Sequence, residues 1–165
     1  MTEREKRLFN LGIITGELGA IAQFNTKTDH GYEFEIEKCP KNENIKDSIA
    51  KRTQHISDSY ELKRIETKNA FNIFFKLFHD KWFYAYQNKD EYHLSDVGDH
   101  FSLYVNPWKK EWIEEFVDFL LQTLNPMNIY EIEYDYLKTY YASDYDEFLF
   151  ECEDGIYHLR LSVSD

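Results

Sequence analysis

The sequence has few cysteines, prolines and glycines, and it contains no long apolar run. Its 165 residues include two cysteines, three prolines and six glycines. Cys39 and Cys152 do not make the disulfide framework of a small secreted domain, so we expect both to be reduced thiols that pack like small apolar side chains. No stretch approaches about 18 consecutive apolar residues, so we expect no membrane-spanning segment.

Positive charge is also scarce. The chain has 31 acidic and 19 basic residues, for a net charge of −12, and such a chain repels the phosphates of nucleic acids. Basic residues near the N-terminus precede an apolar stretch, as they do in a secretory signal, but Glu3, Glu5 and Glu17 interrupt that pattern. We therefore expect a cytoplasmic protein that binds neither nucleic acid nor membrane directly.

The apolar content is nevertheless sufficient for a folded core. Leucine, isoleucine, valine and phenylalanine make up 44 of the 165 residues, which is above the level typical of disordered chains. The length fits one domain. We predict a single α+β domain over residues 1–165, with a mainly antiparallel sheet of about six strands, an N-terminal helix and a second long helix packed on one face of the sheet.

The N-terminal helix is indicated by its first residues. Thr2 and Glu5 have the spacing of a capping box, and leucines and isoleucines then recur every three or four residues to about position 24. Gly12, Gly16 and Gly19 lie within this helix, although glycine destabilises a helix interior. We therefore expect a neighbouring element to approach closely at these glycines.

The second helix is predicted for residues 107–124. Asn106–Pro107 supplies an N-cap followed by proline at the first helical position, and Asn125–Pro126 follows the last turn. Between these signals, apolar residues form one stripe at helical spacing: Ile113, Phe116, Val117, Leu120, Leu121 and Leu124. This stripe should face the sheet.

Alternation of apolar and polar residues predicts the strands. Residues 32–37 and 130–136 each carry three carboxylates on one side, and shorter strands are expected at 60–64 and 101–105. Residues 71–78 and 82–86 resemble a hairpin because they are rich in aromatic residues. The four phenylalanines within 71–78 also fit helical spacing, so periodicity alone leaves strand or helix open for residues 66–79.

A hairpin is also predicted at the C-terminus. Asp154–Gly155 is a favoured two-residue turn, here between segments 148–153 and 156–163. That closure places Cys152 opposite Tyr157 and Glu151 opposite His158, and it leaves one face of the hairpin apolar throughout.

The negative charge is concentrated in the same part of the chain. Residues 1–64 carry no net charge, residues 65–126 carry −4, and residues 127–165 carry −8 together with seven of the 13 tyrosines. Carboxylates attract a basic partner, and tyrosine supplies contact area at low entropic cost. We predict a protein-binding face made of Glu131, Glu133, Asp135, Tyr140, Tyr141, Asp144, Tyr145, Asp146, Glu147, Glu151 and Glu153.

These features favour a non-enzymatic inhibitor of the immunity type, which neutralises a basic toxin, for example a nuclease, by covering its active site. A DNA mimic that blocks a defence enzyme is an alternative. A small enzyme or ligand-binding domain with a site near Asp96, Asp99 and His100 is another. None of the six histidines lies three or four residues from another, so no metal-ligand spacing is present, and we expect no metal or cofactor.

Overall fold

The computed structural model describes residues 1–25, 31–40, 44–83 and 108–164. Within these ranges the chain forms helices and strands in this order: α1 (Glu3–Asn25), β1 (Gly31–Lys38), α2 (Ile45–Thr53), β2 (Tyr60–Ile65), α3 (Thr67–Lys76), the π-helix η1 (Leu77–Trp82), α4 (Trp108–Leu124), β3 (Asn128–Tyr134), β4 (Asp144–Cys152) and β5 (Gly155–Ser164). The predicted α+β class is confirmed.

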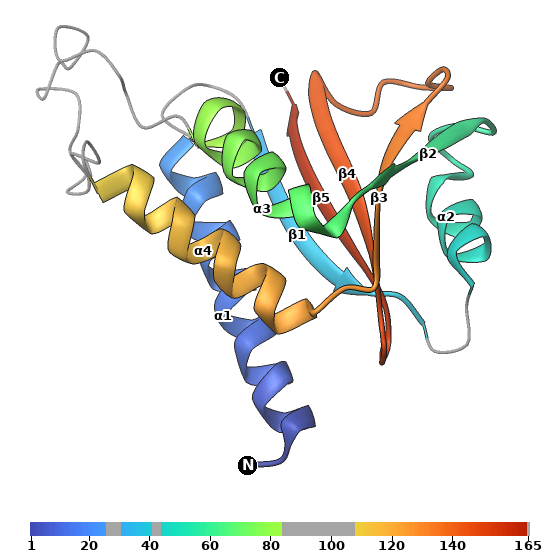
Figure 1. Cartoon of the computed structure of the whole chain (residues 1–165). Helices are drawn as coiled ribbons and strands as arrows, with labels where there is room; N and C mark the ends of the chain where they lie inside the picture. The colour runs from blue at the N-terminus through green and yellow to red at the C-terminus, as the bar shows by residue number, and fades with distance from the viewer. Residues whose placement is uncertain (26–30, 41–43, 84–107, 165) are drawn as a thin grey trace, which may run out of the picture.

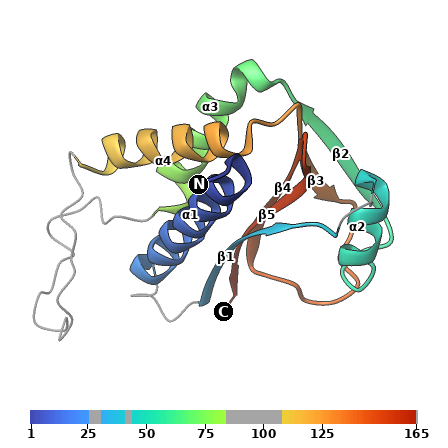
Figure 2. The same cartoon turned by 90° about the horizontal axis from the view of Figure 1, so that it is seen from below.

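Within the described part of the chain, the strands form one antiparallel sheet of five strands in the order β1-β5-β4-β3-β2. About six strands were expected, and the one predicted at 101–105 lies outside the described residues. Figures 1 and 2 show α1, α3 and α4 together on one side of the sheet and α2 on the other. The main core lies on the three-helix side, where Phe148, Phe150 and Leu159 of the sheet are buried.

The capping signals in the sequence predict where α1 begins and where α4 lies. The Thr2 amide donates to Glu5 Oε2 at 2.6 Å and the Glu5 amide donates to Thr2 Oγ1 at 3.2 Å, which confirms the capping box. Helix α4 spans almost the predicted range and packs against α1, α3 and η1. Among the residues that the structure describes, none of these helices has the length and apolar character needed to cross a membrane.

The prediction for the glycines of α1 is wrong. A Cβ atom built on Gly12, Gly16 or Gly19 would have no heavy atom of a neighbouring element within 4 Å among the described residues. The buried stripe of α1 also starts later than predicted, since Leu8 is 60% exposed while Ile14 and Leu18 are fully buried. The first turns of α1 extend past the sheet in Figure 1, and the exposed Leu8 and Phe9 belong to this part of the helix, whereas Leu11 packs against the core.

The hairpin predicted at 71–78 and 82–86 is also wrong, because α3 and η1 occupy residues 67–82. The segment is helical because a helix places Phe74 and Phe78 on the same side, where both are buried. The centroid of the Phe74 ring lies 4.9 Å from the ring centroid of Phe148 and 5.3 Å from that of Phe150. Packing against the sheet therefore overrides the strand preference of the aromatic residues.

The C-terminal hairpin forms, but its register differs from the prediction by two residues. Cys152 pairs with Gly155 and Phe150 with Tyr157, so Glu153 and Asp154 make the turn. His158 consequently lies opposite Leu149 rather than opposite Glu151. A shift of two residues keeps every side chain on its predicted face, because side chains alternate with a period of two.

Contacts of Asp154 and Gly155 account for this register. Asp154 accepts hydrogen bonds from Lys38 Nζ at 2.6 Å and from the Tyr157 hydroxyl at 2.8 Å, and it pairs with Arg7. Gly155 has a φ of +142°, which L side chains rarely adopt. Glycine is therefore required as the first residue of β5 and not as the second residue of the turn.

Two alanine substitutions test these assignments together. Gly16→Ala should stabilise the protein by about 0.5–1 kcal/mol, because the new methyl group meets open space in a helix interior. Gly155→Ala should destabilise it by about 1–3 kcal/mol, because of its backbone conformation. Urea unfolding measures both. If Gly16→Ala proved as damaging as Gly155→Ala, a neighbour would have to contact α1 at that position.

Candidate functional site

The predicted binding residues do not share one face of the sheet. Pairing places Glu131 opposite Phe148, and Phe148 packs against α3. By strand alternation Glu131, Glu133, Asp144 and Asp146 therefore lie on the side of the three helices. Tyr145, Glu147 and Glu151 lie on the side of α2, Glu153 lies in the β4–β5 turn, and Asp135, Tyr140 and Tyr141 lie in the connection between β3 and β4.

The carboxylates on the three-helix side are largely paired with lysines. Lys63 Nζ lies 2.5 Å from Glu133 Oε2, and Lys81 Nζ lies 3.0 Å from Asp144 and 2.7 Å from Asp146. Burial, together with the charges of Glu133 and Asp146, raises the pKa of Glu131. These contacts reduce the negative potential that this side of β3 and β4 presents to a partner.

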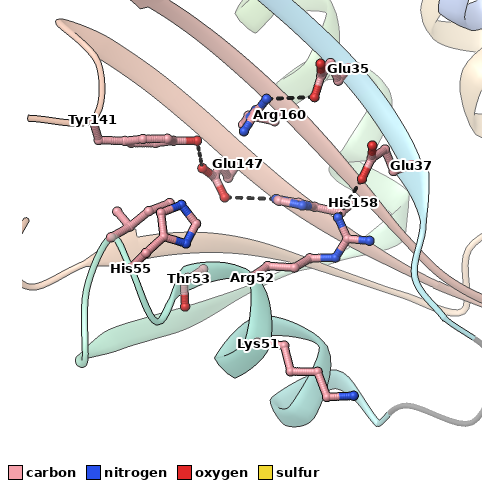
Figure 3. A pocket seen from close by; sticks show the side chains of 11 residues that line it. Glu35, Glu37, Lys51, Arg52, Thr53, His55, Tyr141, Glu147, His158 and Arg160 are labelled. Atoms are coloured by element: carbon pink, nitrogen blue, oxygen red, sulfur yellow. Dashed lines mark hydrogen bonds and ion pairs between the residues drawn. The ribbon is translucent and has the colours of Figure 1, made fainter.

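Glu147 is not a surface residue, although it was predicted as one of the binding residues. It is 1% exposed, and its carboxylate accepts hydrogen bonds from the Tyr134 hydroxyl at 2.8 Å and the Tyr141 hydroxyl at 2.5 Å. Its Oε2 atom also lies 2.9 Å from His158 Nε2. Figure 3 shows the Glu147 carboxylate between the side chains of Tyr141 and His158.

Electrostatics explain how this carboxylate is tolerated. Burial alone would raise the pKa of Glu147, but the hydrogen bond and charge of His158, with the two tyrosine hydroxyls, outweigh burial and lower it. Burial and the nearby Glu147 charge raise the pKa of Tyr134 and of Tyr141. Both tyrosines therefore stay neutral, and their hydroxyls donate hydrogen bonds to a charged acceptor.

The β3–β4 connection, residues 135–143, is held in place along its length. We call it the tyrosine loop. The Asp135 amide donates to Ser59 O at 3.1 Å, the Lys138 amide donates to Ile56 O at 2.7 Å, and the Ser143 amide donates to Val163 O at 2.8 Å. Lys138 Nζ also donates to Gln54 O at 2.8 Å and pairs with Asp58. With the hydrogen bond from Tyr141 to Glu147, the loop is attached to the segment between α2 and β2, to β5 and to β4.

The tyrosine loop displays large side chains to solvent. Tyr136 is 51% exposed, Tyr140 is 67% exposed, and Leu137 is also exposed. The Tyr140 hydroxyl shares a hydrogen bond of 2.9 Å with Ser143 Oγ. Tyr136 and Leu137 were missed by the sequence prediction, which extended the strand to residue 136, whereas β3 ends at Tyr134. Leu137 and Lys138 end the alternation, but both lie beyond Tyr134, so the pattern alone does not locate the end of β3.

The enzyme alternative near Asp96, Asp99 and His100 falls outside the described residues. Within the part of the chain that the structure describes, no group of three or more histidine, cysteine, aspartate or glutamate side chains is arranged to hold a metal ion. Cys39 and Cys152 are buried and form no disulfide, and burial raises the pKa of Cys152 to about 12.

Replacing Glu147 tests whether it anchors this region. Glu147→Gln should lower the free energy of unfolding at pH 7 by about 2–4 kcal/mol, because the variant loses charge-assisted hydrogen bonds in a buried site. The pKa of Glu147 is lowered by folding, so its contribution is present above its ordinary value of 4.5 and is lost as the pH falls through the lower folded value. The difference from wild type should therefore shrink in acid.

Glu151→Gln is the matched control for urea unfolding between pH 7 and pH 3. Glu151 lies on the same strand and the same face, but it is only partly buried and accepts one hydrogen bond, from Asn128 Nδ2 at 2.8 Å. We expect a change below about 1 kcal/mol. Equal effects of the two substitutions would contradict an anchoring role for Glu147.

Comparisons of this chain with protein-family models, with curated proteins and with solved structures found no match.

Proposed function

We propose that this chain is a protein-binding inhibitor of the immunity type, which docks onto a basic protein through the tyrosine loop. The observation that supports this most strongly is the exposure of Tyr136 and Tyr140 on a backbone that the fold already fixes. A partner that binds an ordered loop loses little conformational freedom in doing so. Exposed tyrosines supply large contact area with few rotatable bonds, which is typical of binding hot spots.

Charge supports a basic partner. Residues 127–165 hold ten acidic and two basic side chains, and the whole chain has a net charge of −12. An ion pair such as that of Lys138 with Asp58 cancels its own charges locally, but the net charge of −12 still gives the chain a negative field at long range. Such a field speeds the approach of a positively charged protein. The proposal rests on the loop rather than on Glu133, Asp144 and Asp146, which are paired with lysines.

A nucleic-acid-cleaving toxin is the partner class that this charge suits best. Such an enzyme presents a positive groove to its substrate, and a negative protein with a rigid aromatic loop can cover that groove. An inhibitor of this kind acts in the cytoplasm, where it protects the cell that makes the toxin.

Substituting the loop tyrosines tests the proposal. The test partner is a basic protein encoded beside this chain, since an inhibitor and its toxin are produced together. Tyr136→Ala and Tyr140→Ala should each weaken binding by roughly 30-fold or more, which corresponds to about 2 kcal/mol for a hot-spot residue. Asp135→Lys should mainly slow association and reduce its dependence on salt.

Phe9→Ala is the control, because Phe9 is an equally exposed aromatic residue on α1, and Figure 1 shows the first turns of α1 far from the β3–β4 connection. Isothermal titration calorimetry gives the affinities, and surface plasmon resonance gives the rates. If both loop variants bound as tightly as wild type while Phe9→Ala bound weakly, the binding surface would be α1 and not the tyrosine loop.

A further inference from the structure

A cavity lies beneath the tyrosine loop, between α2 and the sheet. Its volume is about 230 Å³, and it is lined by residues of β1, β4, β5 and α2 together with Tyr141. In Figure 3 the buried Glu147 and His158 form the floor, Arg52 and His55 come from α2 and the segment that follows it, and Arg160 comes from β5. The protein-binding proposal does not use this cavity.

The carboxylates that line the cavity already accept hydrogen bonds. Arg52 Nη1 donates to Glu37 Oε2 at 2.7 Å, and Arg160 Nη2 donates to Glu35 Oε2 at 2.7 Å. The Glu147 carboxylate accepts hydrogen bonds from two tyrosines and lies against His158, so its partners are protein groups and we do not assign it to a ligand. Each of these carboxylates therefore has at least one protein donor.

The donors, in contrast, retain unused capacity. Arg160 Nε is buried and has no hydrogen-bond partner among the described residues. His158 uses Nε2 toward Glu147, and the described residues give its Nδ1 atom no hydrogen bond. Each arginine uses part of its guanidinium for one or two glutamates, Arg160 also interacts with Tyr141 and Arg52 with Cys39, and an arginine can donate five N–H bonds. The buried Nε–H of Arg160 is thus a donor for which the described residues supply no acceptor, and a ligand oxygen could fill that role.

We propose that the cavity binds a small molecule that carries a carboxylate or phosphate group, with its anionic oxygens held by Arg52, Arg160 and His158. Guanidinium groups match the planar oxygens of such anions with paired hydrogen bonds. Lys51, Arg52 and Arg160 line the cavity together with Glu35, Glu37 and Glu147, so its basic and acidic side chains balance, and an anion would have to replace a glutamate on an arginine.

Glu35 and Glu37 would compete with the ligand. Their side chains are 49% and 58% exposed, so both can turn toward water when an anion takes their place on the arginines. This arrangement predicts that removing the charge of Glu37 strengthens anion binding. A purely structural role for the Arg52–Glu37 pair predicts no such gain.

The test is a titration of the full chain with inorganic phosphate and, separately, with citrate. The readouts are the imidazole signals of His158 and His55 in nuclear magnetic resonance spectra and the midpoint of thermal unfolding. We expect saturable shifts of the His158 signal and a rise of the midpoint with one or both anions. A response to phosphate but not to citrate would identify a phosphate ligand, and a response to citrate but not to phosphate would identify a carboxylate ligand.

Four variants decide the assignment. Arg160→Gln and Arg52→Gln should each weaken anion binding about tenfold or more, and Glu37→Gln should strengthen it several-fold. Arg64→Gln is the control and should leave anion binding unchanged, because Arg64 lies on β2 and donates a hydrogen bond to Asn128. Circular dichroism verifies that each variant is folded. The proposal is overturned if neither anion gives a saturable shift, if Arg64→Gln weakens binding as much as Arg160→Gln, or if Glu37→Gln weakens it.

Discussion

The hydrogen-bonded burial of the Glu147 carboxylate is the interaction on which the arrangement of β3, β4, β5 and the tyrosine loop depends. An ionised carboxylate without partners would be strongly destabilising at a position that is 1% exposed. Tyr134 of β3, Tyr141 of the tyrosine loop and His158 of β5 provide those partners. One side chain of β4 thereby joins two neighbouring strands and the connection that follows β3.

This network separates two surfaces with different chemistry. On its outer side, the tyrosine loop turns Tyr136 and Tyr140 toward solvent, where a protein partner can contact them. On its inner side, His158 and Arg160 line a cavity, and the buried Nε atom of Arg160 has no hydrogen-bond partner among the described residues. Tyr141 belongs to both, since it lines the cavity and fixes the loop. Its role is therefore to hold the predicted binding residues in position rather than to be one of them.

Local signals in the sequence were sufficient for the capping box, the long helix α4 and the strands expected at 32–37 and 60–64, and for the one expected at 130–136 except its last two residues. They failed for α3, because the spacing of Phe74 and Phe78 fits a strand or a helix until Phe148 and Phe150 are placed beneath them. Alternation did contain one unused signal: Asp146 and Glu147 are adjacent, so a strand must send them to opposite faces. The lysine partners Lys63 and Lys81 are distant in sequence, so no pattern in residues 127–165 could reveal them.

The central claim is that Glu147 holds the tyrosine loop in place through Tyr141. Hydrogen–deuterium exchange of Tyr141→Phe tests it most directly, because this variant removes only the hydroxyl that donates to Glu147. The account predicts faster exchange at the amides of Lys138 and Ser143, which hold the loop, and unchanged exchange in α1. Unchanged exchange at Lys138 and Ser143 would contradict the account.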